Sequence, residues 1–290
     1  TQVYGQIAAQ NVDPIEKKPL FHFLPGSRSF SVATAGCNLH CKFCQNWNLS
    51  QSKPDDVTSV YMPPASIVQA AEREKCETIA YTYSEPIIYY ELVLDTARKA
   101  KQAGIYNVLV TAGYINEEPL RRLIPYIDAA HLDLKGFSEE YYQDMTSGTL
   151  AEVLRTLSIL KQSGVWVEII NLVVPTKNDD PELIEKMCVW IRDTLGSDTP
   201  VHFSRFYPMY KLKDIPPTPV ATLERARDIA RKVGLKYVYI GNVPGHPGEY
   251  TYCPKCGKVL IERAGYSIRT NHIVKGRCGY CGEPIAGKWK

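Results

Sequence analysis

Residues 35–44 read Ala35-Gly36-Cys37-Asn38-Leu39-His40-Cys41-Lys42-Phe43-Cys44. The cysteines follow the spacing C-x3-C-x2-C, and an aromatic residue precedes the third. Iron–sulfur clusters are held by cysteine thiolates, usually four. Three thiolates would leave one iron open to a ligand from outside the protein, and an open coordination position is where metal chemistry takes place. We therefore expect Cys37, Cys41 and Cys44 to hold a catalytic iron–sulfur cluster.

Zinc binding and disulfide formation are the alternatives for this triplet. Zinc needs a fourth ligand, and His40 lies inside the triplet, where a converging geometry is hard to make. Disulfides would leave an odd cysteine unpaired. Both alternatives therefore fit the spacing less well than a cluster does.

The composition indicates a globular protein of the cytoplasm. A chain of 290 residues with 44% hydrophobic and 22% charged residues can bury a sizeable core. Its net charge of +3 is too weak to indicate nucleic acid or a membrane as a partner. We see neither a run of ~20 apolar residues nor a signal peptide. Most of the nine cysteines are clustered, which suits metal binding in a reducing compartment better than disulfides.

Strand-like and helix-like segments alternate along most of the chain. Strands are predicted at 29–34, 78–83, 107–111, 129–134, 165–174, 201–206 and 236–240, and helices at 64–75, 87–103, 117–124, 150–162, 181–195 and 220–233. Gly104, Gly164 and Gly234 follow helices, as left-handed caps require. The alternation predicts an α/β fold with a parallel sheet or partial barrel. Residues 1–28 have no periodic pattern, and we expect an arm packed on the barrel.

The segment His131-Leu132-Asp133-Leu134-Lys135 places polar side chains at the end of a predicted strand. Chemistry in βα barrels gathers at the carboxyl ends of the strands. The alternation turns His131, Asp133 and Lys135 toward the lumen and the two leucines toward the helices. A charged pair in a lumen is costly unless it contacts a ligand. The alternative is an internal ion pair that only stabilises the barrel.

Two C-x2-C pairs near the end, Cys253 with Cys256 and Cys278 with Cys281, match the pattern of a zinc ribbon. Rubredoxin-like iron or a second cluster are the alternatives. A module spanning residues 250–290 is too small to build its own core and needs its metal to fold. We expect this ribbon to dock a partner protein or to cap the barrel. Four aromatic residues are candidate anchors for docking: Tyr252, Tyr266, Tyr280 and Trp289.

The sequence TAGCNLHCKFCQNW at 34–47 resembles the cluster loop of radical S-adenosylmethionine (SAM) enzymes, among them the activating enzymes of glycyl-radical enzymes such as pyruvate formate-lyase. The longer run 13–47 and the segments YIGNVPGH and TYCPKCGKVL resemble the AmmeMemoRadiSam family. This resemblance covers nearly the whole chain. It implies a partial (β/α)6-type barrel over residues 29–245, an arm at 1–28 and a small zinc-ribbon-like module at 250–290.

The resemblance also implies where SAM is bound. Tyr83-Ser84-Glu85 occupies the place of a Gly-Gly-Glu motif that meets the methionyl amine. Glycine favours close approach of a loop to a ligand, so the departure implies either a shifted loop or side-chain contacts. The alternative is a plain helix start with Ser84 as its N-cap. The other residues that the resemblance assigns to SAM are Phe43, Thr111, Asp133, Lys135 and Tyr207.

The resemblance implies a definite chemistry. A reduced 4Fe–4S cluster on the three loop cysteines would cleave SAM to a 5′-deoxyadenosyl radical, which abstracts hydrogen from a substrate. The leading substrate is a glycyl residue of a partner protein, with a low-potential ferredoxin or flavodoxin as electron donor. The alternatives are another protein side chain, a small molecule, or a non-catalytic iron–sulfur electron carrier. Asp133 and Lys135 in the lumen favour the enzyme over the carrier.

Overall fold

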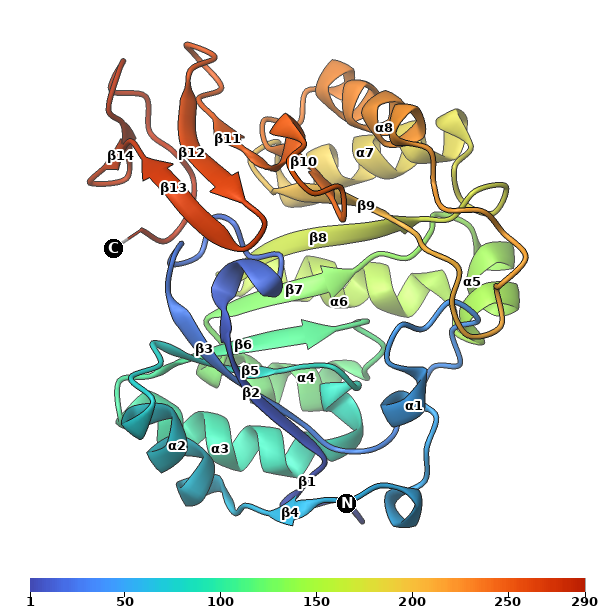
Figure 1. Ribbon diagram of the computed structural model, residues 1–290, viewed down its shortest axis with the longest axis vertical. Coiled ribbons are helices and arrows are strands. Elements are labelled where there is room, and N and C mark those ends of the chain that lie inside the picture. The colour runs from blue at the N-terminus through green and yellow to red at the C-terminus, as the bar shows by residue number, and fades with distance from the viewer. Residues whose placement is uncertain (290) are drawn as a thin grey trace.

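The computed structural model describes residues 1–289. Within them, one sheet holds eight strands in the order β10-β9-β8-β7-β6-β5-β3-β2 (Figure 1). Its strands are β2 (Ala9–Pro14), β3 (Arg28–Ala33), β5 (Thr78–Tyr81), β6 (Tyr106–Thr111), β7 (Ala129–Asp133), β8 (Trp166–Val173), β9 (Val201–Arg205) and β10 (Val238–Gly241). Neighbouring strands from β3 to β10 are parallel, which confirms the predicted α/β fold.

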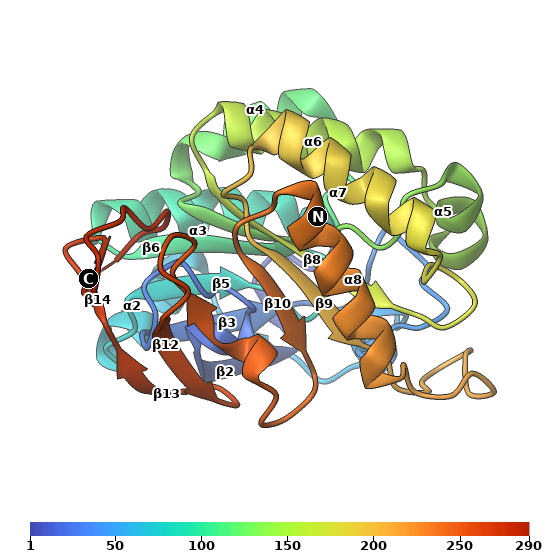
Figure 2. The same cartoon turned by 90° about the horizontal axis from the view of Figure 1, so that it is seen from above.

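Helices connect the parallel strands. Figure 2 shows α4 and α6 on the side of the sheet opposite to two later strands, β12 (Val259–Ala264) and β13 (Ser267–Asn271). The helices are α1 (Trp47–Ser50), α2 (Pro64–Arg73), α3 (Tyr90–Gln102), α4 (Glu117–Leu123), α5 (Glu139–Thr146), α6 (Leu150–Gln162), α7 (Pro181–Leu195) and α8 (Val220–Val233). Helices α6, α7 and α8 have the predicted bounds, and Gly234 follows α8 with a left-handed φ of +106°. None of the helices within residues 1–289 is long and apolar enough to cross a membrane.

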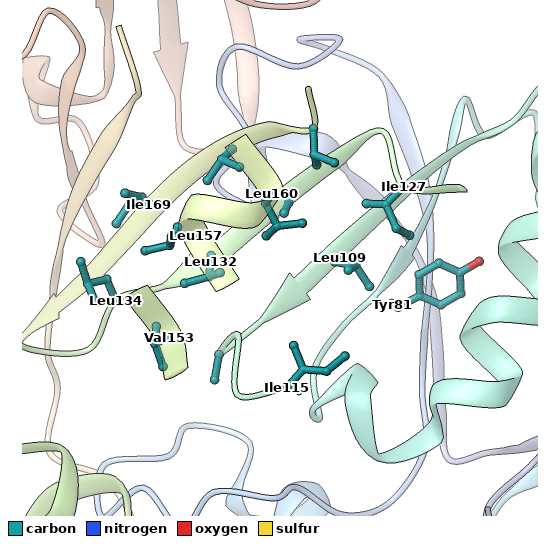
Figure 3. Packing of buried hydrophobic residues seen from close by; sticks show 14 of the residues in the cluster. Tyr81, Leu109, Ile115, Ile127, Leu132, Leu134, Val153, Leu157, Leu160 and Ile169 are labelled. Atoms are coloured by element: carbon teal, nitrogen blue, oxygen red, sulfur yellow. The ribbon is translucent and has the colours of Figure 1, made fainter. Parts of the chain in front are cut away.

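The main core lies between the sheet and these helices. Leu132 and Leu134, at the end of β7, are fully buried beside α6 (Figure 3). Figure 3 also shows the facing side chains of α6, which are Val153, Leu157 and Leu160. Because side chains alternate along a strand, the polar residues that alternate with these leucines, His131, Asp133 and Lys135, face the inner side of the sheet.

The N-terminal arm, residues 1–28, contributes a strand that the sequence did not predict. Strand β2 pairs antiparallel with β3 at the edge of the sheet. Its residues, Ala9-Gln10-Asn11-Val12-Asp13-Pro14, lack the apolar alternation of a half-buried strand, because an edge strand exposes much of its surface. Beyond it, four apolar arm residues cover the inner faces of β5, β6 and β7: Ile15, Leu20, Phe23 and Leu24.

The arm is fixed to the sheet through Glu168 of β8, which is completely buried. Its carboxylate accepts hydrogen bonds from the backbone N–H groups of Phe21 (3.0 Å) and His22 (2.7 Å). It also accepts from Trp166 Nε1 (3.0 Å) and His202 Nε2 (2.8 Å). Burial opposes ionisation of Glu168, but these donors and the nearby histidines outweigh it and lower its pKa to about 2. Glu168 is therefore a buried anion, and two of its four hydrogen bonds hold the arm on the sheet.

The C-terminal ribbon packs on both the arm and the barrel. Its strands are β11 (Thr251–Tyr252), β12 (Val259–Ala264), β13 (Ser267–Asn271), β14 (Ile273–Val274) and β15 (Arg277–Cys278). Arg263 of β12 is buried and donates to the carbonyl oxygens of Phe21 (2.9 Å) and Glu249 (3.2 Å). Of the four aromatic residues proposed as docking anchors, only Tyr266 and Tyr280 are exposed. The centre of the Trp289 ring instead lies 5.2 Å from the centre of the buried His22 ring.

Candidate active site

A cavity of about 770 Å³ lies on the inner side of the sheet, at the carboxyl ends of the strands. The segments that line it include the loops after β3, β5, β6, β7 and β9. All of the residues predicted for the cluster and for SAM line this cavity: Cys37, Cys41, Phe43, Cys44, Tyr83, Ser84, Glu85, Thr111, Asp133, Lys135 and Tyr207. The structure therefore brings together residues that are up to 170 positions apart in the sequence.

The loop after β3 is shaped by backbone hydrogen bonds to the end of α5. Gly36 has a φ of +104°, which favours glycine, and turns the chain into the loop. His40 N donates to Thr146 O (2.8 Å), and Lys42 N donates to Met145 O (2.9 Å). These bonds fix the backbone on both sides of Cys41. The cysteines of the loop are therefore held on a defined frame.

The three thiols of this loop are free and available to a metal. Burial raises the pKa of Cys37 to about 12 and that of Cys41 to about 11, so both are neutral thiols that would lose their protons on binding a metal. The Leu39 N–H donates to Cys37 Sγ (3.4 Å), and Ser50 Oγ lies 3.1 Å from Cys44 Sγ. His40 is exposed, and its Nδ1 contacts Gln51 Oε1 (2.9 Å) instead of turning toward the thiols.

Asp133 and Lys135 form an ion pair in the cavity, with Lys135 Nζ 2.9 Å from Asp133 Oδ2. His131 Nε2 lies 3.0 Å from the other carboxylate oxygen, and His131 Nδ1 donates to Lys18 O (2.7 Å) in the arm. Burial opposes ionisation of Asp133, but Lys135 and His131 outweigh it and hold its pKa well below its usual range. Burial likewise disfavours the charge on Lys135, but Asp133 and Cys41 hold its pKa well above its usual range. The lumen therefore holds fixed charges of both signs close to the thiols.

Glu85 orders the loop that follows β5. Its carboxylate accepts from Thr111 Oγ1 (2.5 Å) and Ala112 N (2.8 Å) at the end of β6. It also accepts from Ile87 N (3.3 Å) and so caps the 3-10 turn η3 (Pro86–Tyr89). The prediction that Ser84 is the N-cap is therefore wrong, because Glu85 takes that role. Ser84 Oγ is buried near the Tyr89 hydroxyl and makes no hydrogen bond of standard length within residues 1–289.

The strand predicted to reach residue 83 ends at Tyr81. Ser84 N donates to Thr82 O (2.8 Å), and Tyr83 between them has a φ of +64°. This left-handed turn breaks the extended backbone, which is why β5 stops early. Tyr83 is a half-buried residue, and its side chain points to the arm, where it meets Asp13. Tyr83, which stands where the related motif has glycine, thus makes side-chain contacts, and this is one of the two outcomes expected for this loop.

The rim of the cavity combines the predicted residue Tyr207 with residues that the sequence did not connect with the site. Tyr207 OH donates to Asn242 O (3.2 Å) at the exposed rim. The arm and the ribbon supply further walls, which include Glu16, Lys17, Lys18, Phe21, Gly265 and Tyr266. Neither segment carries a local pattern that marks such a role. His246 does not line the cavity, and its Nδ1 instead accepts from Gly248 N (2.9 Å) and caps the turn η5 (Pro247–Glu249).

A second group of cysteines lies in the ribbon. The Sγ atoms of Cys253, Cys256, Cys278 and Cys281 all lie within 4.8 Å of one another. Two of the separations, between Cys253 and Cys281 and between Cys256 and Cys278, are 3.6 and 3.8 Å. Tetrahedral zinc with Zn–S bonds of ~2.3 Å would separate its sulfurs by roughly 3.8 Å. Within residues 1–289 these four cysteines are the one group of His, Cys, Asp or Glu side chains that gathers so closely, and their spacing suits a single tetrahedral ion.

The comparison with known families and sequences agrees with this site. The model of the radical SAM superfamily matches residues 31–187, which include the loop thiols, Glu85 and Asp133. The uncharacterized protein MJ0808 of Methanocaldococcus jannaschii is 48% identical over 284 residues, which cover 97% of this chain and 84% of that protein. The pyruvate formate-lyase 1-activating enzyme of Escherichia coli K12 is 24% identical over 231 residues, which cover 74% of this chain and 93% of that enzyme.

A solved structure shares the fold. The structure of SuiB from Streptococcus suis bound to S-adenosylmethionine matches with a TM-score of 0.59 and 12% sequence identity. The match covers 79% of this chain and 53% of the SuiB chain, so this chain spans about half of the length of that protein. At this identity the likeness concerns the fold of the barrel alone.

Proposed function

Because the chain belongs to the radical SAM superfamily, we propose that Cys37, Cys41 and Cys44 hold its 4Fe–4S cluster and that the adjoining cavity binds SAM. Members of this superfamily are enzymes that use both groups, so the chain is an enzyme of radical chemistry. One observation carries the assignment of residues: three free thiols from one loop and the ion pair of Asp133 and Lys135 line the same cavity. An electron carrier would have no use for such a charged pair.

The residues around the thiols fit the cluster and SAM. The three free thiols supply the type of ligand that holds iron–sulfur clusters. When bound, the reduced cluster supplies the electron that splits SAM into methionine and a 5′-deoxyadenosyl radical, which removes a hydrogen atom from the substrate. Lys135 provides a fixed positive charge for the methionyl carboxylate, and Asp133 provides an acceptor for the ribose hydroxyls. The buried Ser84 Oγ lies in the same wall and offers a further polar atom to the ligand.

The other residues of the cavity fix the geometry and exclude water. Glu85, bonded to Thr111 and Ala112, ties the loop after β5 to the loop after β6. Apolar side chains such as Ile170 and Leu172 line the cavity between the polar groups. A dry, preorganised wall strengthens the electrostatic contacts within it and protects a radical from side reactions.

The substrate that we propose is a glycyl residue of a partner protein, with a low-potential ferredoxin or flavodoxin as electron donor. The E. coli relative is named as an activating enzyme of pyruvate formate-lyase, and its similarity to most of this chain supports a protein substrate. Radical chemistry on another side chain or on a small molecule is the alternative. Peptides that present glycine or another residue to the reduced enzyme would separate these substrates by the product that forms.

For the ribbon we propose a structural zinc ion on Cys253, Cys256, Cys278 and Cys281. The close approach of the four sulfurs supports a single tetrahedral ion, and rubredoxin-like iron is the alternative. A closed site with four thiolates leaves no open position for catalysis. Elemental analysis of protein purified from medium that supplies both metals would distinguish zinc from iron.

The decisive experiment is an anaerobic incubation of the reconstituted, reduced protein with SAM. We expect 5′-deoxyadenosine and methionine in equal amounts, measured by chromatography. The matched control is Cys188→Ala, which removes a buried thiol of α7 and should leave the reaction unchanged. If the protein binds a cluster and SAM but forms no 5′-deoxyadenosine with any low-potential reductant, the electron-carrier alternative is correct.

A further inference from the structure

The loop that follows β5 is held in an unfavourable backbone conformation by the N-terminal arm. Tyr83 has a φ of +64°, in the left-handed region that residues with a side chain seldom adopt. Such a conformation persists only where surrounding contacts hold it. Ser84 and Glu85 follow directly, and all three residues line the cavity. Whatever holds Tyr83 in place therefore also sets the position of the wall on which we have placed SAM.

The contacts that hold Tyr83 come from the arm, 70 residues away in the sequence. The Tyr83 hydroxyl donates to the Asp13 carboxylate, and Lys18 Nζ lies 4.4 Å from the centre of the Tyr83 ring. Asn11 Nδ2 adds a weaker hydrogen bond to the same hydroxyl (3.3 Å). The side chain is thus bound at its tip and covered on its face.

Asp13 is itself fixed by the residues around it. It is buried, and its carboxylate accepts from Lys18 Nζ (2.7 Å), Lys17 Nζ (2.9 Å) and Ser31 Oγ (2.9 Å). A charged acceptor with three other donors cannot turn away, so the Tyr83 hydroxyl has a stationary partner. The anchor therefore belongs to the sheet, since Ser31 lies on β3.

The other side of the loop is tied to the cysteine loop. The Tyr83 carbonyl oxygen accepts from Asn46 Nδ2 (2.9 Å), two residues after Cys44. Tyr83 therefore joins the arm, through its side chain, to the loop that carries the thiols, through its backbone. A glycine at this position could take the same φ without strain, but it could not make the side-chain link.

We propose that Asp13 is a positioning residue for SAM: by binding the Tyr83 hydroxyl, it holds residues 83–85 in the conformation that receives the methionyl end. The proposal rests on the proposed function, because it assumes that SAM is bound at this wall. Without the anchor, Tyr83 relaxes to a negative φ and the wall moves. SAM would then have to restore the left-handed turn on binding, and its affinity falls by the cost of that turn.

The first test is Tyr83→Phe, which removes the hydroxyl and leaves Asp13 paired with its lysines. The free-energy cost of holding one residue with a side chain in the left-handed conformation corresponds to a factor of about 5–30 in an equilibrium constant. We expect the dissociation constant of SAM, measured on the reconstituted enzyme by equilibrium dialysis, to rise about 5–30-fold. In the protein without cofactors, amide hydrogen exchange of residues 82–88 should become faster. The matched control is Tyr4→Phe, which removes a similar hydroxyl bonded to Asp95 (2.8 Å) and should change neither quantity.

A second test separates positioning from general stability. Asp13→Asn should weaken SAM binding when residue 83 is tyrosine. Combined with Tyr83→Gly, the same Asp13→Asn change should alter the dissociation constant less than about twofold, because glycine needs no anchor to keep a positive φ. Melting temperatures of the four proteins show whether any of them is simply unfolded.

The outcomes are distinct from those of the proposed function. A wild-type protein that binds neither a cluster nor SAM contradicts the proposed function, and with it the premise of this inference. If the wild type and Tyr83→Phe bind SAM with the same dissociation constant, the positioning role of Asp13 is wrong, while the proposed function still stands. An equal effect of Asp13→Asn on tyrosine and glycine backgrounds also overturns it, because the carboxylate would then act by a route other than Tyr83.

Discussion

Replacing Glu168 by Gln should loosen the arm that forms one wall of the cavity. The carboxylate accepts four hydrogen bonds, two on each oxygen. An amide in its place keeps one accepting oxygen and turns an NH2 group toward the other two donors. Two hydrogen bonds to a charged group are lost, which costs about 3–6 kcal/mol. For a chain of 290 residues, the entropy of unfolding is about 0.6 kcal/mol/K, so the melting temperature should fall by about 5–10 °C.

Differential scanning calorimetry at pH 7 measures this change, and hydrogen exchange locates it. The exchange of residues 15–24 should become faster before the rest of the barrel opens, because Phe21 N and His22 N lose a charged acceptor. Glu118→Gln is the control, since that side chain is 82% exposed and its substitution should shift the melting temperature by less than about 1 °C. A Glu168→Gln protein that melts within about 1 °C of the wild type would refute the view that Glu168 secures the arm.

Other predictions address the metals, SAM and pH. Replacing any one of the three loop cysteines by Ala should abolish the iron–sulfur absorbance of the reconstituted protein, while the metal content of the ribbon is unchanged. Asp133→Ala should keep the cluster and weaken SAM binding about 10–100-fold, since a charged hydrogen bond contributes ~1.5–3 kcal/mol; an unfolded variant would support the internal ion pair instead. The pKa of Glu168 is lowered from 4.5 to about 2, so its contribution to stability is full above pH 4.5 and is lost as the pH falls through about 2. Denaturant titrations should therefore show the gap between wild type and Glu168→Gln closing over that range. The double variant Cys253→Ser with Cys256→Ser should release the ribbon metal and displace Tyr266 from the cavity wall. We then expect SAM to be cleaved to 5′-deoxyadenosine while the substrate is no longer modified. A variant that still modifies the substrate would contradict a role for the ribbon at the cavity.

The parallel core was predictable because its signals are local. Apolar strands alternate with amphipathic helices, and glycines mark the helix ends, so each element could be recognised from about ten neighbouring residues. The lumen face of β7 followed from alternation alone, since Leu132 and Leu134 had to face α6. The thiol loop was equally local, because its three cysteines lie within eight residues of one another.

The arm was not predictable for the opposite reason. Strand β2 is an edge strand whose residues show no apolar period, and its pairing with β3 depends on contacts that no local window contains. The hydrogen bond from Tyr83 to Asp13 joins residues 70 positions apart. The choice of Glu85 over Ser84 as helix cap also depended on Thr111, which lies on another strand. Each missed feature is a polar contact between distant segments, and a single sequence does not encode such contacts in its local pattern.

The way in which the chain closes its partial barrel bears on what can enter it. A sheet that stops at β2 on one side and β10 on the other leaves its inner face open between these edges. The arm and the ribbon fill this space, and buried Arg263 joins them through Phe21 O. Exposed residues of both segments, Lys17 and Tyr266, line the cavity together with exposed Tyr207 from the barrel. Under the proposed function, a substrate has to pass these side chains to reach a radical formed near the thiols. Changes in the arm or the ribbon would then alter the choice of substrate while Asp133 and Lys135 keep the proposed SAM site.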